Sequence, residues 1–417
     1  MQDLTPVTLM SERRPRLLLI TRNFPPLWGG MERLNWHLAD ELAKTHAVRV
    51  IGPAGAAQHA PAQVPVCEAP LTPLYRFLLH TTILAQREAR RWRPDWVLAG
   101  SGLTAPMALI AARACDARSA AYVHGLDLIV PHPVYRALWL PALRRMDRVI
   151  ANSTATAELA RKAGVRDERL SIVHPGVDIP VPDPSARARF RQRWNLPPDA
   201  PVLLSVGRLT ARKGLREFVQ EVLPTVVKAR PDVVLAIVGN APKQALYAQA
   251  QTPESILEAA HARGMAPNVR WIGTLFGQDL TDAYFGADLH VFPVRKIPGD
   301  PEGFGMVAVE AAAHGLPTVA YATGGVVDAV REGQSGRLIP PGDAAGFAQA
   351  VLATLAAPFA PEGCRTFAQR FAWVEFGHRI MDALLADSES NVVFRCLGRS
   401  HECDSNPRHP KFHDPAQ

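Results

Sequence analysis

The sequence is poor in cysteine and contains no long apolar run. Its five cysteines are odd in number and scattered, so they form no disulfide framework and fit a reducing compartment. Residues 1–14 carry charges and no apolar core, so no secretion signal is visible. The most apolar stretch, 97–112, is interrupted by glycine and proline and is interpreted as a buried strand, a turn and a small-residue helix. These absences favour a cytoplasmic protein that is soluble or only peripheral to a membrane.

Two chemical patterns are also missing. There is no Asp-x-Asp triplet, a common way to hold a divalent ion against phosphate groups, and the nearest match is Asp300-Pro301-Glu302. No metal and no other cofactor is therefore expected. The net charge of +7 suits phosphate-bearing ligands or an anionic surface. No recognisable nucleic-acid-binding module accompanies this charge, so nucleic acid is not an expected partner.

The 417 residues do contain two series of short apolar segments separated by helical patterns. Near-continuous apolar strands that alternate with helices indicate parallel sheets covered on both faces. Two series predict an α/β protein of two doubly wound, Rossmann-like domains that face each other across a cleft. The expected strands are 16–20, 48–52, 96–100, 120–125, 148–153 and 170–176 in the first series, and 202–207, 233–239, 269–273, 289–293, 317–321 and 337–340 in the second.

Proline divides the chain between the two series. Six prolines fall within 177–201, around a short basic helical stretch at 187–193, and proline breaks regular structure. An amphipathic pattern beginning at Trp373 predicts a last helix. The expected division is a first domain at 1–180, a linker at 181–200, a second domain at 201–371, a crossover helix at 372–387 and a disordered polar tail at 388–417.

Candidate binding residues of the first domain follow expected strands. Gly29 and Gly30 precede a helix, where backbone N–H groups can approach a phosphate, although a tight turn would need the same residues. This loop is not Gly-x-Gly-x-x-Gly, which argues against a standard dinucleotide site. His124 could hydrogen-bond a hydroxyl in the cleft, with Asp127 orienting it. The alternative is a structural histidine.

The second domain offers cations and carboxylates at strand ends. Arg208 and Lys213 lie between glycines just after its first strand and could neutralise a diphosphate, although both could also be solvated surface charges. Glu310 falls in a helix that is apolar nearly all round, so it needs a partner to offset the cost of burial. A ribose diol would serve, and His314 or a local backbone donor are the alternatives. Glu302, before this helix, could bind sugar hydroxyls or merely complement the helix dipole.

Together these segments resemble the retaining nucleotide-sugar glycosyltransferases of the GT-B fold, glycosyltransferase family 4, over about residues 16–386. Glu302 and Glu310 match the family's Glu-x-seven-Glu motif, within the typical sequence Pro-Glu-Gly-Phe-Gly. Gly-Arg-Leu-Thr-Ala-Arg-Lys-Gly is similar to its diphosphate-binding segment, and Phe-Pro-Pro-Leu-Trp-Gly-Gly-Met-Glu to its first glycine loop. Asn152-Ser153 and Pro175-Gly-Val-Asp178 match its crossing region.

The resemblance implies a role for each candidate. Glu310 would hold the ribose, Glu302 the donor sugar, and Arg208 and Lys213 the diphosphate. The expected catalytic residues are Glu302, Arg208, Lys213 and His124. The remaining donor-binding residues implied are Gly29, Gly30, Gly303, Phe304 and Gly305 around the diphosphate, and Thr274 and Leu275 at the base. His124 would lie beside the transferred sugar, and the last helix would return to the first domain.

The resemblance also implies a reaction. The acceptor hydroxyl would attack on the face from which the diphosphate leaves, and a phosphate oxygen would take its proton, so no protein nucleophile is required. A hexose would pass from a UDP- or GDP-linked donor to a glycan or lipid-linked acceptor of an envelope polysaccharide or glycolipid. The alternatives are a nucleotide-sugar epimerase or a pyridoxal-dependent phosphorylase of the same fold, or a binding protein without catalysis.

Two stretches suggest contact with an anionic membrane surface. Residues 75–93 and 135–148 mix tryptophan and leucine with several arginines, a composition that suits a lipid interface. Two ordinary helices packed on a sheet would show the same composition.

Overall fold

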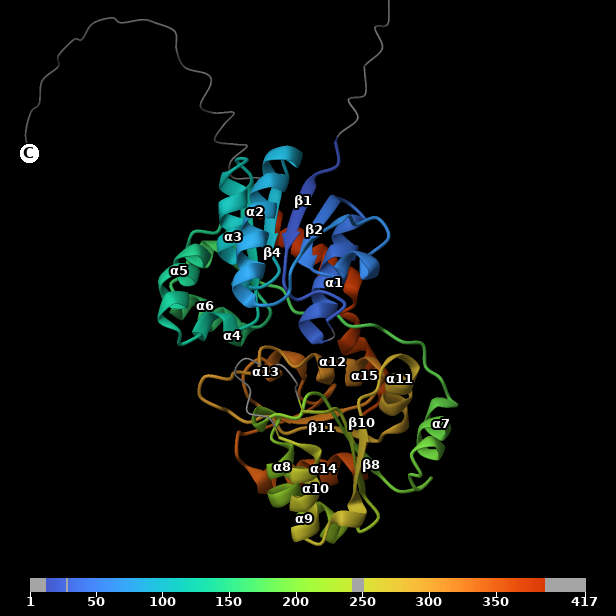
Figure 1. The fold of residues 1–417 in the computed structure, drawn as a ribbon. Helices are drawn as coiled ribbons and strands as arrows, with labels where there is room; N and C mark the ends of the chain where they lie inside the picture. Colours follow the sequence, from blue (N-terminus) through green and yellow to red (C-terminus); the bar gives the residue numbers. More distant parts are fainter. Residues whose placement is uncertain (1–12, 28, 242–250, 387–417) are drawn as a thin grey trace, which may run out of the picture.

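The computed structural model describes residues 13–27, 29–241 and 251–386. They form two parallel sheets, each with helices on both faces, one above the other in Figure 1. The expected two-domain α/β architecture is therefore confirmed. The tail expected at 388–417 lies outside the described residues.

The first sheet has seven parallel strands in the order β3-β2-β1-β4-β5-β6-β7. Six of them coincide with expected strands, and the edge strand β3 was missed because its four residues, with a glutamate among them, give no clear apolar pattern. The strands are β1 (Arg16–Ile20), β2 (Ala47–Pro53), β3 (Val66–Ala69), β4 (Trp96–Ala99), β5 (Arg118–Val123), β6 (Arg148–Ala151) and β7 (Leu170–Ile172).

Alternation along β1 shows how the layers form. Leu18 and Ile20 pack into a core under one layer of helices, whereas Leu17 and Leu19 pack into the core on the opposite face, because successive side chains of a strand point to opposite sides. The first layer contains α2 (Leu74–Trp92), α3 (Ala105–Arg113), α5 (Pro133–Arg144) and α6 (Thr154–Lys162); the second contains α1 (Gly30–Ala43) and α16 (Trp373–Leu385). The last helix thus returns to the first domain.

The second sheet has six parallel strands in the order β10-β9-β8-β11-β12-β13. All six coincide with expected strands: β8 (Val202–Val206), β9 (Val234–Val238), β10 (Val269–Gly273), β11 (Leu289–Phe292), β12 (Thr318–Tyr321) and β13 (Gly336–Ile339). Its helices include α9 (Leu223–Ala229), α10 (Pro253–Ala262), α11 (Gly277–Gly286), α12 (Met306–Ala313), α13 (Val326–Ala329), α14 (Ala344–Ala356) and α15 (Pro361–Gln369).

The proline-rich segment contains the expected basic helix, α7 (Ala186–Arg193), and this helix packs on α11. Arg189 of α7 donates two hydrogen bonds to Asp282 of α11, at 2.8 and 2.5 Å. Much of the segment between the two sheets is therefore attached to the second domain.

The chain crosses between the domains twice, and the two crossings are joined. The Val177 amide donates to the Phe371 carbonyl at 2.7 Å, and the Trp373 indole donates to Asp178 at 3.1 Å. Among the described helices, none is by itself both long and apolar enough to cross a membrane; α14 and α15 meet this test only as a pair bent by 113°.

Candidate active site

The carboxyl ends of the two sheets face each other. Gly303, in the loop after β11, approaches the first domain so closely that an added Cβ would lie 2.5 Å from the His124 carbonyl, which follows β5. Gly30, at the start of α1, lies beside Met306 at the start of α12. In a doubly wound sheet, ligands bind beyond the carboxyl ends of the strands. The cleft between these loops is therefore the candidate active site.

Glu302 is the centre of a buried ionic cluster. Its side chain is 9% exposed, and its Oε2 atom accepts a hydrogen bond from Lys213 Nζ at 2.8 Å and lies 3.0 Å from Arg212 Nη1. Burial alone would raise the pKa of Glu302, but the two cations outweigh it and lower the pKa, so the carboxylate is ionised. No donor in the described part of the chain contacts Oε1. One oxygen of Glu302 is thus fixed, and the other is available to a sugar hydroxyl.

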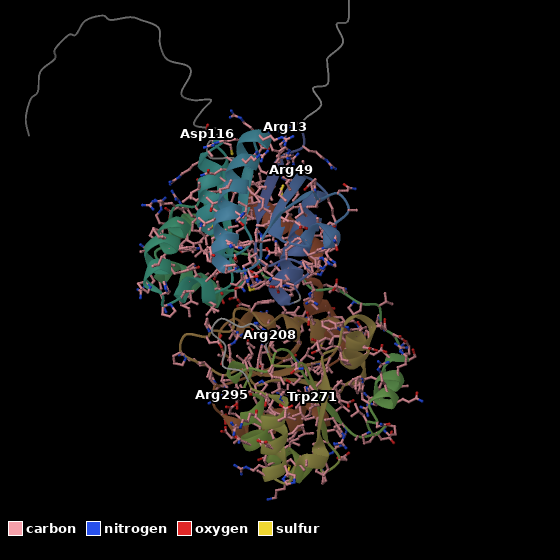
Figure 2. The ribbon with its side chains drawn as sticks, in the orientation of Figure 1. Arg13, Arg49, Asp116, Arg208, Trp271 and Arg295 are labelled. Carbon is pink, nitrogen blue, oxygen red and sulfur yellow. The ribbon has the colours of Figure 1, made fainter. Side chains whose placement is uncertain are left out.

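Arg212 is a site residue that the sequence analysis missed. Besides Glu302, it binds the Pro301 carbonyl at 2.9 Å and lies 3.3 Å from Asp300, so it holds residues 300–302 of the loop before α12. The available signal was its position next to Lys213 in a glycine-bounded basic segment. The predicted Arg208, by contrast, is exposed and does not contact Glu302; Figure 2 places it at the edge of the second domain facing the first.

The loop before α12 presents free backbone donors. The amides of Gly303, Phe304 and Gly305 donate to no acceptor within the described residues. Gly305 caps α12 with a φ of 98°, a conformation that favours glycine. Unpaired amides at the start of a helix suit a phosphate or a hydroxyl.

Glu310 is bound by neither of the alternative partners that its helix suggested. His314 Nδ1 lies 2.7 Å from the Glu310 carbonyl rather than from its carboxylate, because a side chain four residues on reaches the backbone first. The carboxylate instead accepts a hydrogen bond from Tyr284 at 2.9 Å and pairs with Arg33 of α1. Arg33 belongs to the other domain, so the predicted ribose-binding carboxylate is part of the domain interface.

His124 is held differently from expectation. Its Nε2 lies 3.1 Å from the Gly100 carbonyl and must donate to it, so in the neutral ring Nδ1 is a hydrogen-bond acceptor. Asp127 does not orient the ring. Its carboxylate accepts backbone N–H groups instead, from Gly102 at 2.8 Å and from His124 and Gly125 at 3.0 Å. Asp127 therefore shapes the loop on which His124 lies.

Of the two residues predicted to contact the base, one is buried and one is exposed. Leu275 is buried in a core cluster beneath α11, so its side chain is not available to a ligand. Thr274 is exposed directly after β10. Of the two predicted residues, only Thr274 has a side chain that is open to a ligand.

Several buried polar atoms at the strand ends lack a partner within the described residues. Buried polar groups normally form hydrogen bonds, and exceptions need an explanation. A polar ligand in the cleft would provide one. The atoms at the ends of β4, β6, β8 and β12 are Ser101 Oγ, Asn152 Oδ1, Thr210 Oγ1 and Thr323 Oγ1.

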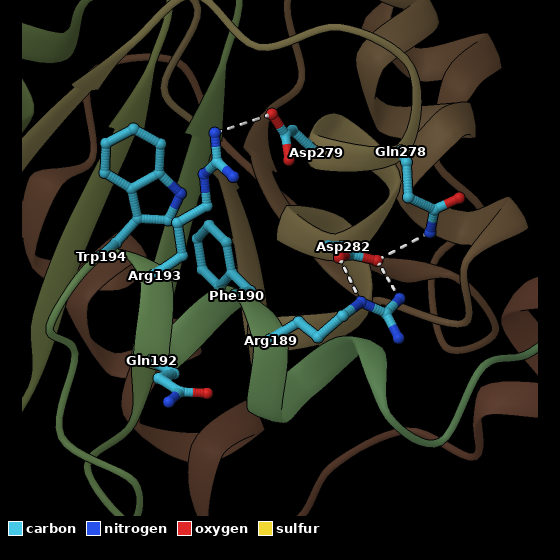
Figure 3. Close-up of a pocket in the computed structure, with 8 residues that line it drawn as sticks. All are labelled: Arg189, Phe190, Gln192, Arg193, Trp194, Gln278, Asp279 and Asp282. Atoms are coloured by element: carbon cyan, nitrogen blue, oxygen red, sulfur yellow. Dashed lines mark hydrogen bonds and ion pairs between the residues drawn. The ribbon is translucent and has the colours of Figure 1, made fainter.

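A groove of about 420 Å³ between α7 and α11 contains none of these residues (Figure 3). Its charged side chains already pair with one another: Arg189 with Asp282, and Arg193 with Asp279 at 3.4 Å. The ion pairs in this groove therefore connect α7 to α11, and the groove is not part of the candidate active site.

Comparison with known proteins assigns the family. The family described as Glycosyl transferases group 1 matches residues 200–357, and Glycosyltransferase Family 4 matches residues 28–180. A GDP-mannose-dependent alpha-(1-6)-phosphatidylinositol monomannoside mannosyltransferase of Mycolicibacterium smegmatis is 31% identical over 364 residues, 82% of this chain and 90% of that protein. The chain therefore belongs to glycosyltransferase family 4.

A second kind of relative matches over a shorter length. D-inositol 3-phosphate glycosyltransferase 2 of Catenulispora acidiphila is 36% identical over 235 residues, 54% of this chain. The match spans 53% of that relative's length.

Solved structures show the same architecture. Anabaena HepE in complex with UDP has a TM-score of 0.72 at 22% identity, over 89% of this chain and 100% of that chain. Sucrose-phosphate synthase from Thermosynechococcus elongatus has a TM-score of 0.68 at 21% identity, over 92% and 100%. At these identities the likeness establishes the fold. With the family assignment, it makes the chain a glycosyltransferase of the GT-B fold.

Proposed function

We propose that this protein is a retaining hexosyltransferase that uses a UDP- or GDP-linked donor without a metal ion or other cofactor. The observation that carries the proposal is Glu302, with one oxygen fixed by Lys213 and Arg212 and the other free, beside the unpaired amides of 303–305. This arrangement presents an acceptor for a sugar hydroxyl next to donors for a diphosphate. GDP-mannose is the first donor to test, because it is named for the relative with the longest of the matches described above.

The proposed step is substitution on the front face of the sugar. The acceptor oxygen bonds to the anomeric carbon while the bond from that carbon to the diphosphate oxygen breaks, and the acceptor proton passes to a phosphate oxygen. Lys213, Arg208 and the amides of Gly303 and Gly305 stabilise the leaving charge, with the loop at Gly29 and Gly30 closing the other side. Glu302 Oε1 and His124 Nδ1 orient the sugar. When the donor binds, the Glu310 carboxylate leaves Arg33 and accepts hydrogen bonds from the ribose hydroxyls.

A thermal-shift panel with UDP, GDP, ADP and their sugar conjugates, run with and without EDTA, tests donor binding. A ligand at 100 times its Kd stabilises a protein by about 2.7 kcal/mol. One base should stabilise the chain equally with and without EDTA, and NMR of the product should show the donor's anomeric configuration. Loss of transfer in EDTA, or an inverted product, would contradict the proposal. Donor interconversion without an acceptor would instead indicate an epimerase, and binding without turnover a non-catalytic protein.

The proposed acceptor is lipid-linked, a precursor of an envelope glycolipid or polysaccharide such as lipopolysaccharide, reached from the cytoplasmic face of the membrane. Helices α2, α3 and α5 lie side by side on the first domain. Their outer face exposes large apolar side chains next to arginines such as Arg76 and Arg136, a combination that suits an anionic interface. The exposed apolar residues are Tyr75, Leu79, Ile83, Ile110, Val134 and Leu138.

Two of the expected interface residues point elsewhere. The Trp139 indole donates to the Leu103 carbonyl at 2.7 Å, and Trp92 packs partly against the core beneath Arg49. The proposed contact therefore depends on the aliphatic side chains. Cosedimentation with anionic vesicles at low salt should fall for Leu79→Ser with Ile83→Ser, and should be unchanged for Leu257→Ser, an exposed leucine of α10. Equal sedimentation of all three proteins would refute membrane association through this face.

A further inference from the structure

A carboxylate of the second domain binds the start of a helix of the first domain. Asp328 of α13 accepts hydrogen bonds from the Thr154 amide at 2.6 Å and from the Thr154 hydroxyl at 2.7 Å. Thr154 begins α6, whose N-terminal cap is Ser153. The negative charge therefore lies at the positive end of a helix dipole, where it is favourable. Figure 1 shows α6 and α13 at the facing edges of the two domains.

His174 adds a second contact from the first domain. Its Nε2 lies 3.3 Å from Asp328 Oδ2, and the Asp328 side chain is only 12% exposed. The same imidazole stacks on Phe304, with 5.3 Å between ring centroids. Phe304 belongs to the loop that presents the free amides at 303–305. One side chain thus contacts both Asp328 and the candidate donor loop.

The segment that carries Asp328 is also attached directly to Glu302. The Gly325 amide donates to the Glu302 carbonyl at 2.9 Å. There is no room for side chains between the two segments, since a Cβ on Gly324 would lie 2.6 Å from the Glu302 carbonyl oxygen, and one on Gly325 would lie 2.2 Å from that of Gly303. Displacement of Asp328 by the first domain would therefore be transmitted to the backbone of 302–303.

We propose that Asp328 is a positioning residue. Through its contacts, closure of the two domains fixes the geometry of the donor loop, residues 302–305. The contacts with Thr154 and His174 exist only while the domains are together, whereas Asp328 faces water when they separate. Closure thus places Glu302 and the free amides, and it excludes water from the donor. The proposal rests on the proposed transferase function for its kinetic consequences, but its structural consequence is independent of it.

The test compares Asp328→Ala and Asp328→Asn with Asp232→Asn, an exposed carboxylate of the same domain that pairs with Arg230. With a turned-over donor, Asp328→Ala should lower kcat 10- to 100-fold while changing the Kd for the free nucleotide less than threefold. The share of donor hydrolysed rather than transferred should rise. Asp328→Asn should fall between this variant and wild type, and Asp232→Asn should match wild type. An unchanged kcat and hydrolysis share in Asp328→Ala would overturn the proposal.

Small-angle scattering separates this proposal from the function itself. Without any ligand, Asp328→Ala should show a larger radius of gyration than wild type at an unchanged circular dichroism spectrum. If Asp328→Ala fails to fold, Thr154→Val removes one hydrogen bond to the same carboxylate and should shift both readouts in the same direction. An identical radius of gyration in wild type and the folded variant would sink the closure proposal, whichever sugar donor the protein uses.

Discussion

At the scale of single residues, the site depends on two cations that share one carboxylate oxygen. Lys213 is buried, which lowers its pKa, while the adjacent Glu302 opposes this effect. Its ammonium also lies 4.5 Å from the Phe292 ring centroid. Lys213 is therefore fixed on several sides and can present its charge to a leaving diphosphate without reorganisation.

Lys213→Ala should lower kcat/KM by about 10²–10³, the usual cost of removing one preorganised electrostatic donor. The fold should persist, because Arg212 still pairs with Glu302. Steady-state kinetics with the donor identified by thermal shift would measure the effect. Arg230→Ala, which removes a surface cation of the same domain, is the matched control and should retain full activity. A turnover of Lys213→Ala within threefold of wild type would contradict the assigned role.

The sequence predicted which segments carry chemistry better than it predicted which side chains meet. Glu302 and Lys213 were both expected, Glu302 because it precedes an apolar helix and Lys213 because it lies in a glycine-bounded basic segment after a strand. Arg33 was not expected, because it pairs with a residue 277 positions away in the other domain, and no local pattern encodes that distance. Arg208 was selected by charge and spacing alone, which do not reveal that its neighbour Arg212 is the residue turned towards Glu302.

At the scale of secondary-structure elements, strands buried on both faces were predictable and the edge strand was not. Strand β9 is buried throughout, so all of its residues are apolar and the run is easily recognised in the sequence. Helix α12 was located because a glycine turn precedes an apolar helix. The attachment of α7 to α11 depends on arginine–aspartate pairs that the basic composition of the segment did not reveal.

The return of α16 to the first domain leads to a stability prediction. Trp373 packs in the core of that domain, and an added Cβ on Gly176 would lie 2.2 Å from its ring. Gly176→Ala should therefore destabilise the protein by about 1–3 kcal/mol, the usual cost of overpacking. Urea unfolding would measure it. Gly363→Ala is the control and should not destabilise the chain, because the added Cβ would lie 3.6 Å from the Gln334 carbonyl oxygen, an ordinary van der Waals contact. Equal midpoints for both variants would show that the Trp373 contact is dispensable.

At the scale of the whole molecule, several histidines are fully or partly buried in surroundings that disfavour the protonated ring. Burial lowers the pKa of His290, in β11, to about 3, and lowers the pKa values of His37 and His314 to about 4. His290 Nδ1 lies 3.1 Å from the Thr318 hydroxyl, and His37 stacks on Trp373 with 3.9 Å between centroids. Together they lie in both domains, so their titration affects the entire chain.

Stability should therefore fall as the pH drops from about 6.5 towards 4. The unfolded chain protonates these histidines near pH 6.5, whereas the folded chain resists until about pH 4 or below, so the unfolded state binds more protons in this window. Each histidine should contribute a loss on the order of 3 kcal/mol, since one pKa unit corresponds to about 1.4 kcal/mol. Total stabilities are only about 5–15 kcal/mol, so losses of this size should be large enough to measure. Urea midpoints at pH 7.5, 6.5, 5.5 and 4.5 would show a decline confined to the acid side.

Two variants provide the control for this prediction. In His290→Asn the urea midpoint should fall less steeply with decreasing pH. In His261→Asn, a position on the exposed face of α10, the decline should match wild type. A midpoint constant from pH 7.5 to 4.5 would mean that these imidazoles are hydrated in the folded protein.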